Sequence, residues 1–318
     1  MLVEAEKCLE ALRCPRTGSK LVCFSPDVLK PVSSEEAGIS YRLIDGKPIV
    51  IDFSQSVFSE GDILRSNAAS PVERKHYGRL SGFLKKLLSP TKKSTVANVK
   101  RLVDDLQATA APPAKLLIIG GGSVGQGMEP LYEHRDIGVY AFDVYTSPLV
   151  QFIADAHNIP LPDDYFDAVV IQAVLEHVLQ PAQVVSEIWR VLKDGGLVYA
   201  ETPFMQQVHE GAFDFTRFSE SGHRYLFRWF ELISSGASGG PGTQFMWSVD
   251  YLVRSVFQSV LLGKIAKLAF FWTQYLDAII PPRFAEDGAS GVYFYGRKAP
   301  TPITPKSIID HYQGAQRK

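Results

Sequence analysis

Short apolar runs alternate with amphipathic segments from Ala114 onward, and this alternation constrains the fold more than any other feature. Strands that are apolar on both sides belong in a parallel sheet that helices cover on both faces. The sequence therefore predicts an α/β fold with a doubly wound, mostly parallel sheet. The expected strands are 115–120, 137–144, 166–172, 196–202 and a closing strand at 291–298, and the expected helices are 126–134, 147–156 and 181–192.

The 318 residues are enough for about two domains. A small α+β unit is expected at the N-terminus, where Asp45-Gly46 is a strong hairpin signal. A basic linker with helices at 83–88 and 96–107 should follow it. The predicted organisation is a small unit over 1–55, a linker over 56–112, an α/β domain over 113–300 with a helical insertion at about 250–280, and a tail over 301–318.

Charge is distributed unevenly although the net charge is only −1. Residues 1–112 hold 17 basic and 13 acidic residues, whereas 113–318 hold 16 and 21. Nine of the basic residues lie in 71–101. We interpret this stretch as a solvated linker, with a surface for an anionic partner or a membrane as the alternative. The acidic second half argues against a nucleic-acid partner.

The three cysteines, Cys8, Cys14 and Cys23, all lie near the N-terminus. A small odd number argues against the disulfide framework of a secreted protein. The first residues lack the basic and apolar regions of a signal peptide, and no apolar run is long enough to span a membrane. The expected location is the cytoplasm.

A glycine-rich turn follows the first strand of the α/β region. Gly120, Gly121, Gly122 and Gly125 form the pattern G-x-G-x-x-G at the point where a helix should open. Such a loop brings an anionic or polar cofactor close to the backbone. Asp143 ends the next strand, where a carboxylate accepts hydrogen bonds from ribose hydroxyls. NAD, FAD and S-adenosylmethionine all fit these features, and a purely structural turn is a further alternative.

A longer pattern distinguishes among these cofactors. The segments ADAHNIPLPDDYFDAVVIQAVLEHV (154–178) and WRVLKDGGLVYAETP (189–203) resemble class I S-adenosylmethionine-dependent methyltransferases of the type-11 methyltransferase-domain family. The resemblance covers roughly 114–205. It implies a seven-stranded Rossmann-like sheet whose last strand is antiparallel. It also implies S-adenosyl-L-methionine as the cofactor.

The resemblance assigns cofactor contacts to individual residues. The glycine loop would line the methionine and ribose, and Asp143 would hold the ribose. One departure concerns position 118, where the family usually has an acidic residue and this chain has isoleucine, so the methionine amino group needs another partner. The remaining implied contacts are Val144 beside the adenine, Asp155 and Ala156 at the adenine amino group and ring, and Gln172 at the methionyl end.

The segment 202–227 is dense in polar and aromatic residues and lies where this fold places acceptor loops. His209 is the expected catalytic base for a hydroxyl acceptor, with Glu210 or Asp214 orienting it. Arg217 is expected to clamp an anionic acceptor. A structural ion pair between Asp214 and Arg217 is the equal alternative. Two further residues are expected at the substrate, His177, which alternatively supports its helix, and His223.

The N-terminal segments CLEALRCPRTGSKL and YRLIDGKPIVI resemble small zinc-ribbon-like proteins that activate methyltransferases. In that family Cys14 would be a metal ligand, but Thr17 replaces the next cysteine and only Cys23 remains. Structural zinc needs four ligands. We therefore expect a metal-free unit with buried thiols, and no metal site elsewhere in the chain.

Residues 251–280 are apolar on almost every side of their expected helices. We interpret them as a lid over the sheet and substrate pocket, with a partner interface or a membrane surface as alternatives.

The expected function is methyl transfer to an oxygen or nitrogen of a small molecule or glycan. A lipid-linked acceptor would suit a membrane surface. The alternatives are a nicotinamide-dependent oxidoreductase, a non-catalytic scaffold and, among enzymes, an RNA methyltransferase. The oligomeric state is left open.

Overall fold

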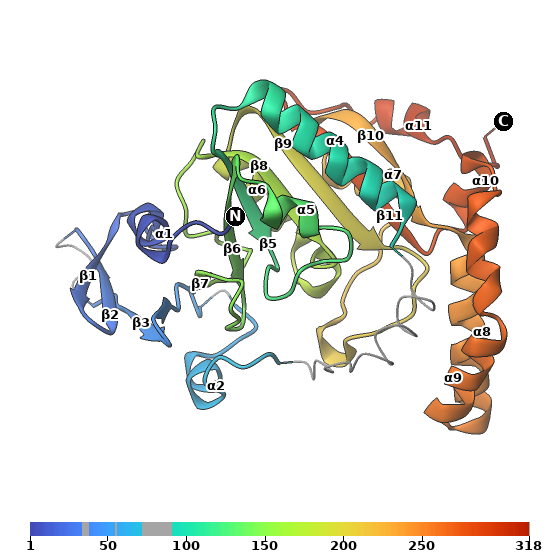
Figure 1. The fold of residues 1–318 in the computed structure, drawn as a ribbon, viewed down its shortest axis with the longest axis horizontal. Helices are drawn as coiled ribbons and strands as arrows, with labels where there is room; N and C mark the ends of the chain where they lie inside the picture. Colours follow the sequence, from blue (N-terminus) through green and yellow to red (C-terminus); the bar gives the residue numbers. More distant parts are fainter. Residues whose placement is uncertain (34–37, 55, 72–90, 318) are drawn as a thin grey trace.

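A seven-stranded sheet forms the centre of the molecule (Figure 1). The computed structural model describes residues 1–33, 38–54, 56–71 and 91–317, so the helix predicted at 83–88 lies outside the described residues. The strand order is β10-β11-β9-β8-β5-β6-β7, and β11 runs antiparallel to both neighbours. The predicted doubly wound fold and antiparallel last strand are confirmed. The strands are β5 (Ala114–Ile119), β6 (Ile137–Asp143), β7 (Phe152–Ile153), β8 (Phe166–Gln172), β9 (Leu192–Pro203), β10 (Phe230–Gly239) and β11 (Gly291–Lys298).

The central strands are buried on both faces, as their apolar sequences predict. In β5, Leu117 pairs with Tyr140 of β6 and Val169 of β8, and its side chain is fully buried. Neighbouring Ile118 points to the opposite face and is also buried. The sheet therefore needs a layer of helices on each side.

Helices supply these two layers. On one face α4 packs its apolar side, including Leu102 and Leu106, against β5 and β6 together with α5. On the other face α6 buries Val184 and Ile188, and Phe227 after α7 stacks on Phe294 of β11. The helices are α4 (Lys93–Thr109), α5 (Glu129–Glu133), α6 (Pro181–Val191) and α7 (Glu220–Leu226).

One expectation about local structure was wrong, and one strand was not predicted. The helix predicted over 147–156 is absent, because this segment turns and then forms the short edge strand β7. The buried amide of Gln151 accepts a hydrogen bond from the N–H of Ala141 and donates to the carbonyl of Val139, which fixes the segment against β6. Strand β10 was not expected, since its serines and glycines are typical of a loop.

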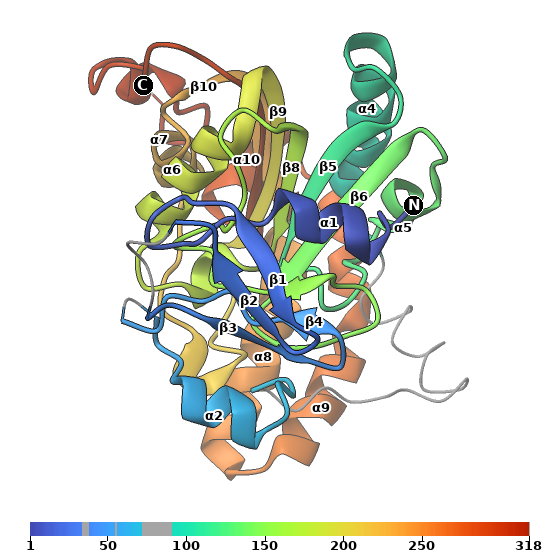
Figure 2. The ribbon, with the colours of Figure 1, turned by 90° about the vertical axis from the view of Figure 1, so that its left-hand side faces the viewer.

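The N-terminal segment forms a small antiparallel sheet with one helix (Figure 2). Its core is shared with the large sheet, because Leu12 and Leu21 lie in the same buried cluster as Phe142 and Phe152. Ile49 forms a parallel bridge with Ile153 of β7, so the unit also extends the edge of the large sheet. The elements are α1 (Ala5–Ala11), β1 (Leu21–Ser25), β2 (Val28–Pro31), β3 (Tyr41–Ile44) and β4 (Lys47–Pro48), followed by α2 (Glu60–Arg65).

Two helices form a hairpin that extends beyond one end of the sheet (Figure 1). Asp277 anchors the hairpin, because its carboxylate accepts hydrogen bonds from the N–H groups of Gly240, Gly242 and Thr243. No described helix is both long and apolar enough to cross a membrane. The hairpin consists of α8 (Pro241–Phe257), α9 (Val260–Ala269) and the 3-10 helix η4 (Phe271–Ala278), and the chain ends with α10 (Pro282–Asp287) and α11 (Ser307–His311).

Candidate active site

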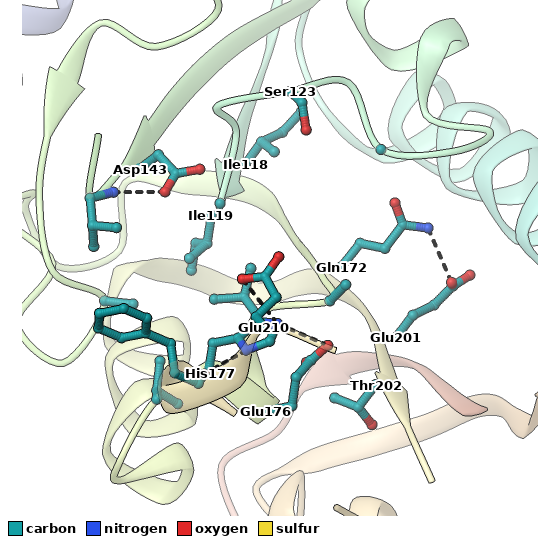
Figure 3. A pocket seen from close by; sticks show the side chains of 18 of the residues that line it. Ile118, Ile119, Ser123, Asp143, Gln172, Glu176, His177, Glu201, Thr202 and Glu210 are labelled. Carbon is teal, nitrogen blue, oxygen red and sulfur yellow. Dashed lines mark hydrogen bonds and ion pairs between the residues drawn. The ribbon is translucent and has the colours of Figure 1, made fainter. Parts of the chain in front are cut away.

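A cavity of about 460 Å³ opens where the central parallel strands end (Figure 3). Its walls come from the carboxyl ends of β5, β6, β8 and β9 and from the loops that follow them. Open α/β sheets bind ligands in this position. The volume is in the range of small-molecule and cofactor sites.

The glycine loop forms one wall, with Gly120 and Gly125 on the cavity surface. Gly120 has a φ of +75°, and a Cβ there would lie 2.3 Å from Val174 Cγ2. A Cβ on Gly121 would lie 2.8 Å from the Cβ of Ala141. The loop does not open a helix directly, because α5 begins at Glu129 instead of the expected 126.

Asp143 lies beside this loop at the end of β6. Its Oδ2 accepts a hydrogen bond from the N–H of Gly122 at 2.9 Å, and its Oδ1 accepts one from the N–H of Val144 at 2.7 Å. Asp143 and Val144 both line the cavity. These contacts fix the carboxylate at the cavity wall.

Asp155 and Ala156 also line the cavity. The buried carboxylate of Asp155 accepts a hydrogen bond from the Ser56 hydroxyl at 2.5 Å and pairs with Nδ1 of His157 at 2.6 Å. Burial alone would raise the pKa of Asp155, but the hydrogen bonds from His157 and Ser56 lower it below its ordinary value. The carboxylate is therefore ionised and acts as an acceptor.

Gln172, the last residue of β8, lines the cavity and donates a hydrogen bond to Glu201 Oε2 at 3.0 Å. Thr95 of α4 donates to the other oxygen of Glu201 at 2.5 Å. Glu201 was not predicted as a site residue. Its place at the carboxyl end of β9 is the signal that could have identified it.

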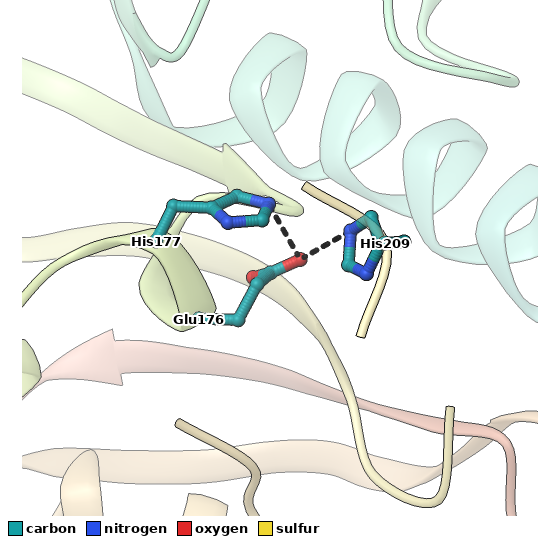
Figure 4. A group of neighbouring side chains, drawn as sticks. All are labelled: Glu176, His177 and His209. Atoms are coloured by element: carbon teal, nitrogen blue, oxygen red, sulfur yellow. Dashed lines mark ion pairs between the residues drawn. The ribbon is translucent and has the colours of Figure 1, made fainter. Parts of the chain in front are cut away.

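Four titratable side chains gather in another part of the cavity wall, formed by a short turn after β8 and the loop after β9. Glu176 and His177 come from the short turn η2 (Leu175–His177), and His209 and Glu210 come from the loop after β9. Glu176 Oε1 lies 3.6 Å from His177 Nε2 and 3.9 Å from His209 Nε2 (Figure 4). Glu210 Oε2 lies 3.7 Å from His177 Nε2. The predicted residues His177, His209 and Glu210 are therefore brought together.

Glu176 was not predicted as a functional residue, although it precedes His177 in the LEHV pattern. It is 1% exposed, and neither carboxylate oxygen has a hydrogen-bond partner in any other described residue. Burial raises the pKa of Glu176 to about 8. Burial also lowers the pKa of His209, and the nearby His177 adds to this effect.

Asp214 and Arg217 form the structural ion pair that was the alternative to an acceptor clamp. Arg217 Nη2 donates to Asp214 Oδ2 at 2.7 Å, and other guanidinium nitrogens donate to backbone carbonyls. Neither residue lines the cavity. Burial opposes ionisation of Asp214, but hydrogen bonds from Arg217 and from the N–H of His209 outweigh it and lower the pKa to about 2. The expectation that Arg217 contacts the acceptor was wrong, because its donors are already engaged.

The prediction that His223 lies at the substrate was also wrong. It lies on α7 with 1% exposure, packs against Phe227, and is not part of the cavity wall. It is a core residue.

The prediction that 251–280 forms a lid over the substrate pocket was wrong. None of the described residues of α8, α9 and η4 lines the cavity.

The region expected to be a linker supplies part of the wall. Val57 and Phe58 line the cavity, and the ring of Phe58 stacks on Phe213 with centroids 5.8 Å apart. Phe213 belongs to the 3-10 helix η3 (Gly211–Phe213) in the loop that carries His209. The start of the predicted linker and this loop therefore meet at the cavity.

The cysteines do not gather into a metal site in the described part of the chain. Cys14 is buried, with its Sγ 3.1 Å from the Tyr41 hydroxyl, whereas Cys23 is exposed. The expectation of buried thiols is correct for Cys8 and Cys14 and wrong for Cys23.

Comparison with known proteins shows that the middle of the chain is similar to methyltransferases. Residues 119–200 match the family model described as "Methyltransferase domain". The demethylmenaquinone methyltransferase of Renibacterium salmoninarum is 35% identical over 113 residues, which are 32% of this chain and 46% of that protein. The ubiquinone/menaquinone biosynthesis C-methyltransferase UbiE of Neisseria meningitidis is 37% identical over 67 residues, which are 21% of this chain and 27% of that protein.

The match thus spans less than half the length of these curated relatives. Among solved structures, phosphoethanolamine N-methyltransferase 2 of Haemonchus contortus in complex with S-adenosyl-L-methionine is 16% identical. That similarity covers 80% of this chain and 62% of the other, with a TM-score of 0.45. The glycine loop and Asp143 both lie within residues 119–200, the stretch that matches the methyltransferase-domain model.

Proposed function

We propose that this protein transfers a methyl group from S-adenosyl-L-methionine to an oxygen or nitrogen of a small molecule or glycan. The observation that carries the proposal is the cradle of Gly120, Gly125 and Asp143 at the carboxyl ends of β5 and β6. It lies within the residues that match the methyltransferase domain. A nicotinamide-dependent oxidoreductase, an RNA methyltransferase and a non-catalytic scaffold remain as competing functions for the experiments below.

The cavity fits this cofactor. Side chains are excluded along the glycine loop, because a Cβ on Gly125 would lie 1.9 Å from Gln172 Oε1. In the proposed assignment Asp143 accepts the ribose hydroxyls, Asp155 accepts from the adenine amino group, and Gln172 faces the methionyl end. When bound, the cofactor supplies a methyl group on a positively charged sulfur.

Glu201 is the residue we assign to the methionine amino group in place of an acid at position 118. Ile118, Val170 and Tyr199 are aligned across β5, β8 and β9. Glu201 lies two residues after Tyr199, so it points to the same face as Ile118, one step nearer the cavity. Its carboxylate can accept from an ammonium group while Gln172 and Thr95 hold it.

The acceptor is assigned to the side of the cavity that holds His209 and Glu210. In-line displacement at a methyl carbon needs an aligned acceptor and, for a hydroxyl, a base for its proton. In a metal-free enzyme His209 Nε2 takes this proton. Asp214 Oδ2 lies 3.2 Å from His209 Nδ1 and would stabilise the resulting imidazolium.

Calorimetric titration of the purified protein with S-adenosylmethionine, and separately with S-adenosylhomocysteine, tests the proposal. Binding should be lost in Asp143→Asn and retained in Asp104→Asn, an exposed position on α4. Binding of NADH in place of both ligands would favour the oxidoreductase. A folded sample that binds none of them would contradict the enzyme and favour the scaffold.

We further propose that the α8–α9 hairpin rests on an anionic membrane surface and that the acceptor is lipid-linked. Residues 251–276 contain three basic residues and no acidic ones. The Tyr251 hydroxyl donates to the carbonyl of Val208 at 2.6 Å, so the hairpin contacts the loop of His209 directly. Large apolar side chains are exposed along it, including Leu252, Val256, Phe257, Leu261, Ile265 and Trp272.

Co-sedimentation with vesicles tests this surface. We expect binding to phosphatidylglycerol-containing vesicles, weaker binding to pure phosphatidylcholine, and loss of both in a Leu261→Glu, Ile265→Glu double variant. Phe24→Glu, an exposed apolar position on β1, is the matched control. Equal sedimentation with and without vesicles would contradict the proposal, and a dimer that the double variant dissociates would identify a protein interface instead.

A further inference from the structure

We propose that Glu176, His177 and His209 bind a divalent transition-metal cation, which we expect to be zinc or manganese, at the acceptor side of the cavity. One ligand atom from each residue lies within 4.8 Å of the other two. Two imidazoles and one carboxylate are a donor set of zinc and of other first-row metals. Magnesium, which prefers oxygen ligands, is not the expected ion.

The distances fit a cation after a small closure. Ligand atoms that share a metal at about 2.1 Å are separated by about 3.0 to 3.4 Å in tetrahedral or octahedral geometry. Glu176 Oε1 lies 3.6 Å from His177 Nε2 and 3.9 Å from His209 Nε2. The first separation therefore needs to shorten by about 0.2 to 0.6 Å and the second by about 0.5 to 0.9 Å. Figure 4 shows both rings directed at the same carboxylate oxygen.

The second nitrogen of each ring faces an acceptor, which leaves Nε2 as the metal-binding atom. Nδ1 of His177 lies 2.7 Å from the carbonyl oxygen of Phe213 and can only donate to it. Nδ1 of His209 lies 3.2 Å from Asp214 Oδ2. Metal-binding histidines have such partners almost always, since the partner fixes the tautomer and the ring orientation. Asp214 is held in turn by Arg217.

Glu176 provides a separate argument. Its side chain is 1% exposed, and no other described residue donates a hydrogen bond to either oxygen. A buried carboxylate without a donor is costly unless a proton or a cation is bound to it. With two Nε2 lone pairs facing the same oxygen, a shared cation satisfies all three atoms at once. Glu210 Oε2, 3.7 Å from His177 Nε2, is placed to be a fourth ligand or to face the bound acceptor.

The chemical role of this cation rests on the proposed methyl transfer. A cation lowers the pKa of a hydroxyl bound to it. His209 would then be a ligand, and the acceptor proton would pass to Glu210 or to water. The acceptor oxygen forms the new bond to the methyl carbon, and the carbon–sulfur bond breaks with its electron pair left on sulfur.

Binding of the metal itself is the test. Tag-free, chelator-treated protein is titrated calorimetrically with Zn²⁺, Mn²⁺ and Mg²⁺, and bound Mn²⁺ is followed by electron paramagnetic resonance. We expect one equivalent of Zn²⁺ or Mn²⁺ to bind, and binding to weaken by at least about tenfold in Glu176→Gln and in His209→Ala. Asp214→Asn should weaken it less, because it removes only the partner of Nδ1.

His311→Ala is the matched control, since His311 pairs with Glu220 at 2.8 Å outside the cavity wall. Circular dichroism verifies that each variant is folded. No binding of Zn²⁺ or Mn²⁺ at millimolar concentration, or equal binding by wild type and His209→Ala, would overturn the inference. S-adenosylhomocysteine is titrated into the same samples, so a failure of the metal site is distinguished from a failure of the proposed function.

Discussion

Gly122 is a residue at which an added methyl group would displace the carboxylate proposed to hold the ribose. A Cβ there would lie 2.2 Å from the Tyr145 hydroxyl and 2.7 Å from Asp143 Oδ2. We expect Gly122→Ala to displace Asp143 and to abolish S-adenosylhomocysteine binding in calorimetry while the protein remains folded. Gly38→Ala is the control, because nothing lies within 4 Å of a Cβ there. Unchanged binding in Gly122→Ala would show that the loop can move without consequence.

His223 should make the protein sensitive to acid. Burial lowers its pKa from 6.5 to about 3, so the folded protein holds the ring neutral whereas the unfolded chain protonates it below pH 6.5. The stabilisation is therefore complete above pH 6.5 and falls by about 1.4 kcal/mol per pH unit toward pH 3.

The test is denaturant unfolding of wild type and His223→Leu between pH 7 and pH 4, a range set by the pKa of about 3 in the fold and 6.5 unfolded. The leucine variant should lose less stability with falling pH, and it also removes two ring nitrogens without partners among the described residues. His134→Leu, outside the buried core, is the control. Parallel curves for wild type and His223→Leu would refute the assignment.

Single residues differ in how far the sequence could predict them. Asp143 follows from its place after a strand and a glycine loop, and it is at the cavity wall. Arg217 and His223 lie in the same polar and aromatic segment, 202–227, as His209. The sequence does not reveal which of these side chains turn into the cavity and which are buried in the core. Glu176 was missed because a glutamate next to a histidine is usually solvated, and only the fold buries it.

Asp277 connects the two ends of the hairpin and is the residue on which that element depends. Its carboxylate accepts from three backbone N–H groups at the start of α8 and from the Thr243 hydroxyl at 2.6 Å. Asp277→Ala should destabilise the hairpin by about 1–3 kcal/mol. Hydrogen exchange should increase over α8 and α9 but not in β5. Asp310→Ala on exposed α11 is the control, and equal exchange in both variants would contradict the role.

At the scale of elements, the central strands and the long helices could be predicted. Burial on both faces of the sheet requires continuous apolar runs in the strands, and packing on the sheet requires one apolar face on each helix. The short edge strand β7 could not be predicted, since two residues carry no periodicity and their pairing with Phe142 and Asp143 is tertiary. Strand β10 could not be predicted either, since its serines and glycines are stabilised by pairing with β11 instead of by their own propensity.

The whole molecule should unfold as one unit, although its sequence suggested separate domains. Leu12 is fully buried in the cluster that also contains Phe142 and Phe152. Leu12→Ala should cost about 2–5 kcal/mol and lower a single calorimetric transition without splitting it. Phe24→Ala, exposed on β1, should change little. Two transitions, with only one shifted, would show that the N-terminal unit is independent.

The shared core also has a consequence for folding during synthesis. Leu12 and Leu21 leave the ribosome more than a hundred residues before Phe142, which belongs to the same buried cluster. At about 5 to 20 residues per second, the nascent N-terminal unit waits roughly 6 to 26 seconds for Phe142. During this interval its apolar side chains are open to chaperones, and the edge of its small sheet is open to other chains. The rate of translation, and not only the sequence, thus bears on how much of this protein reaches its folded state.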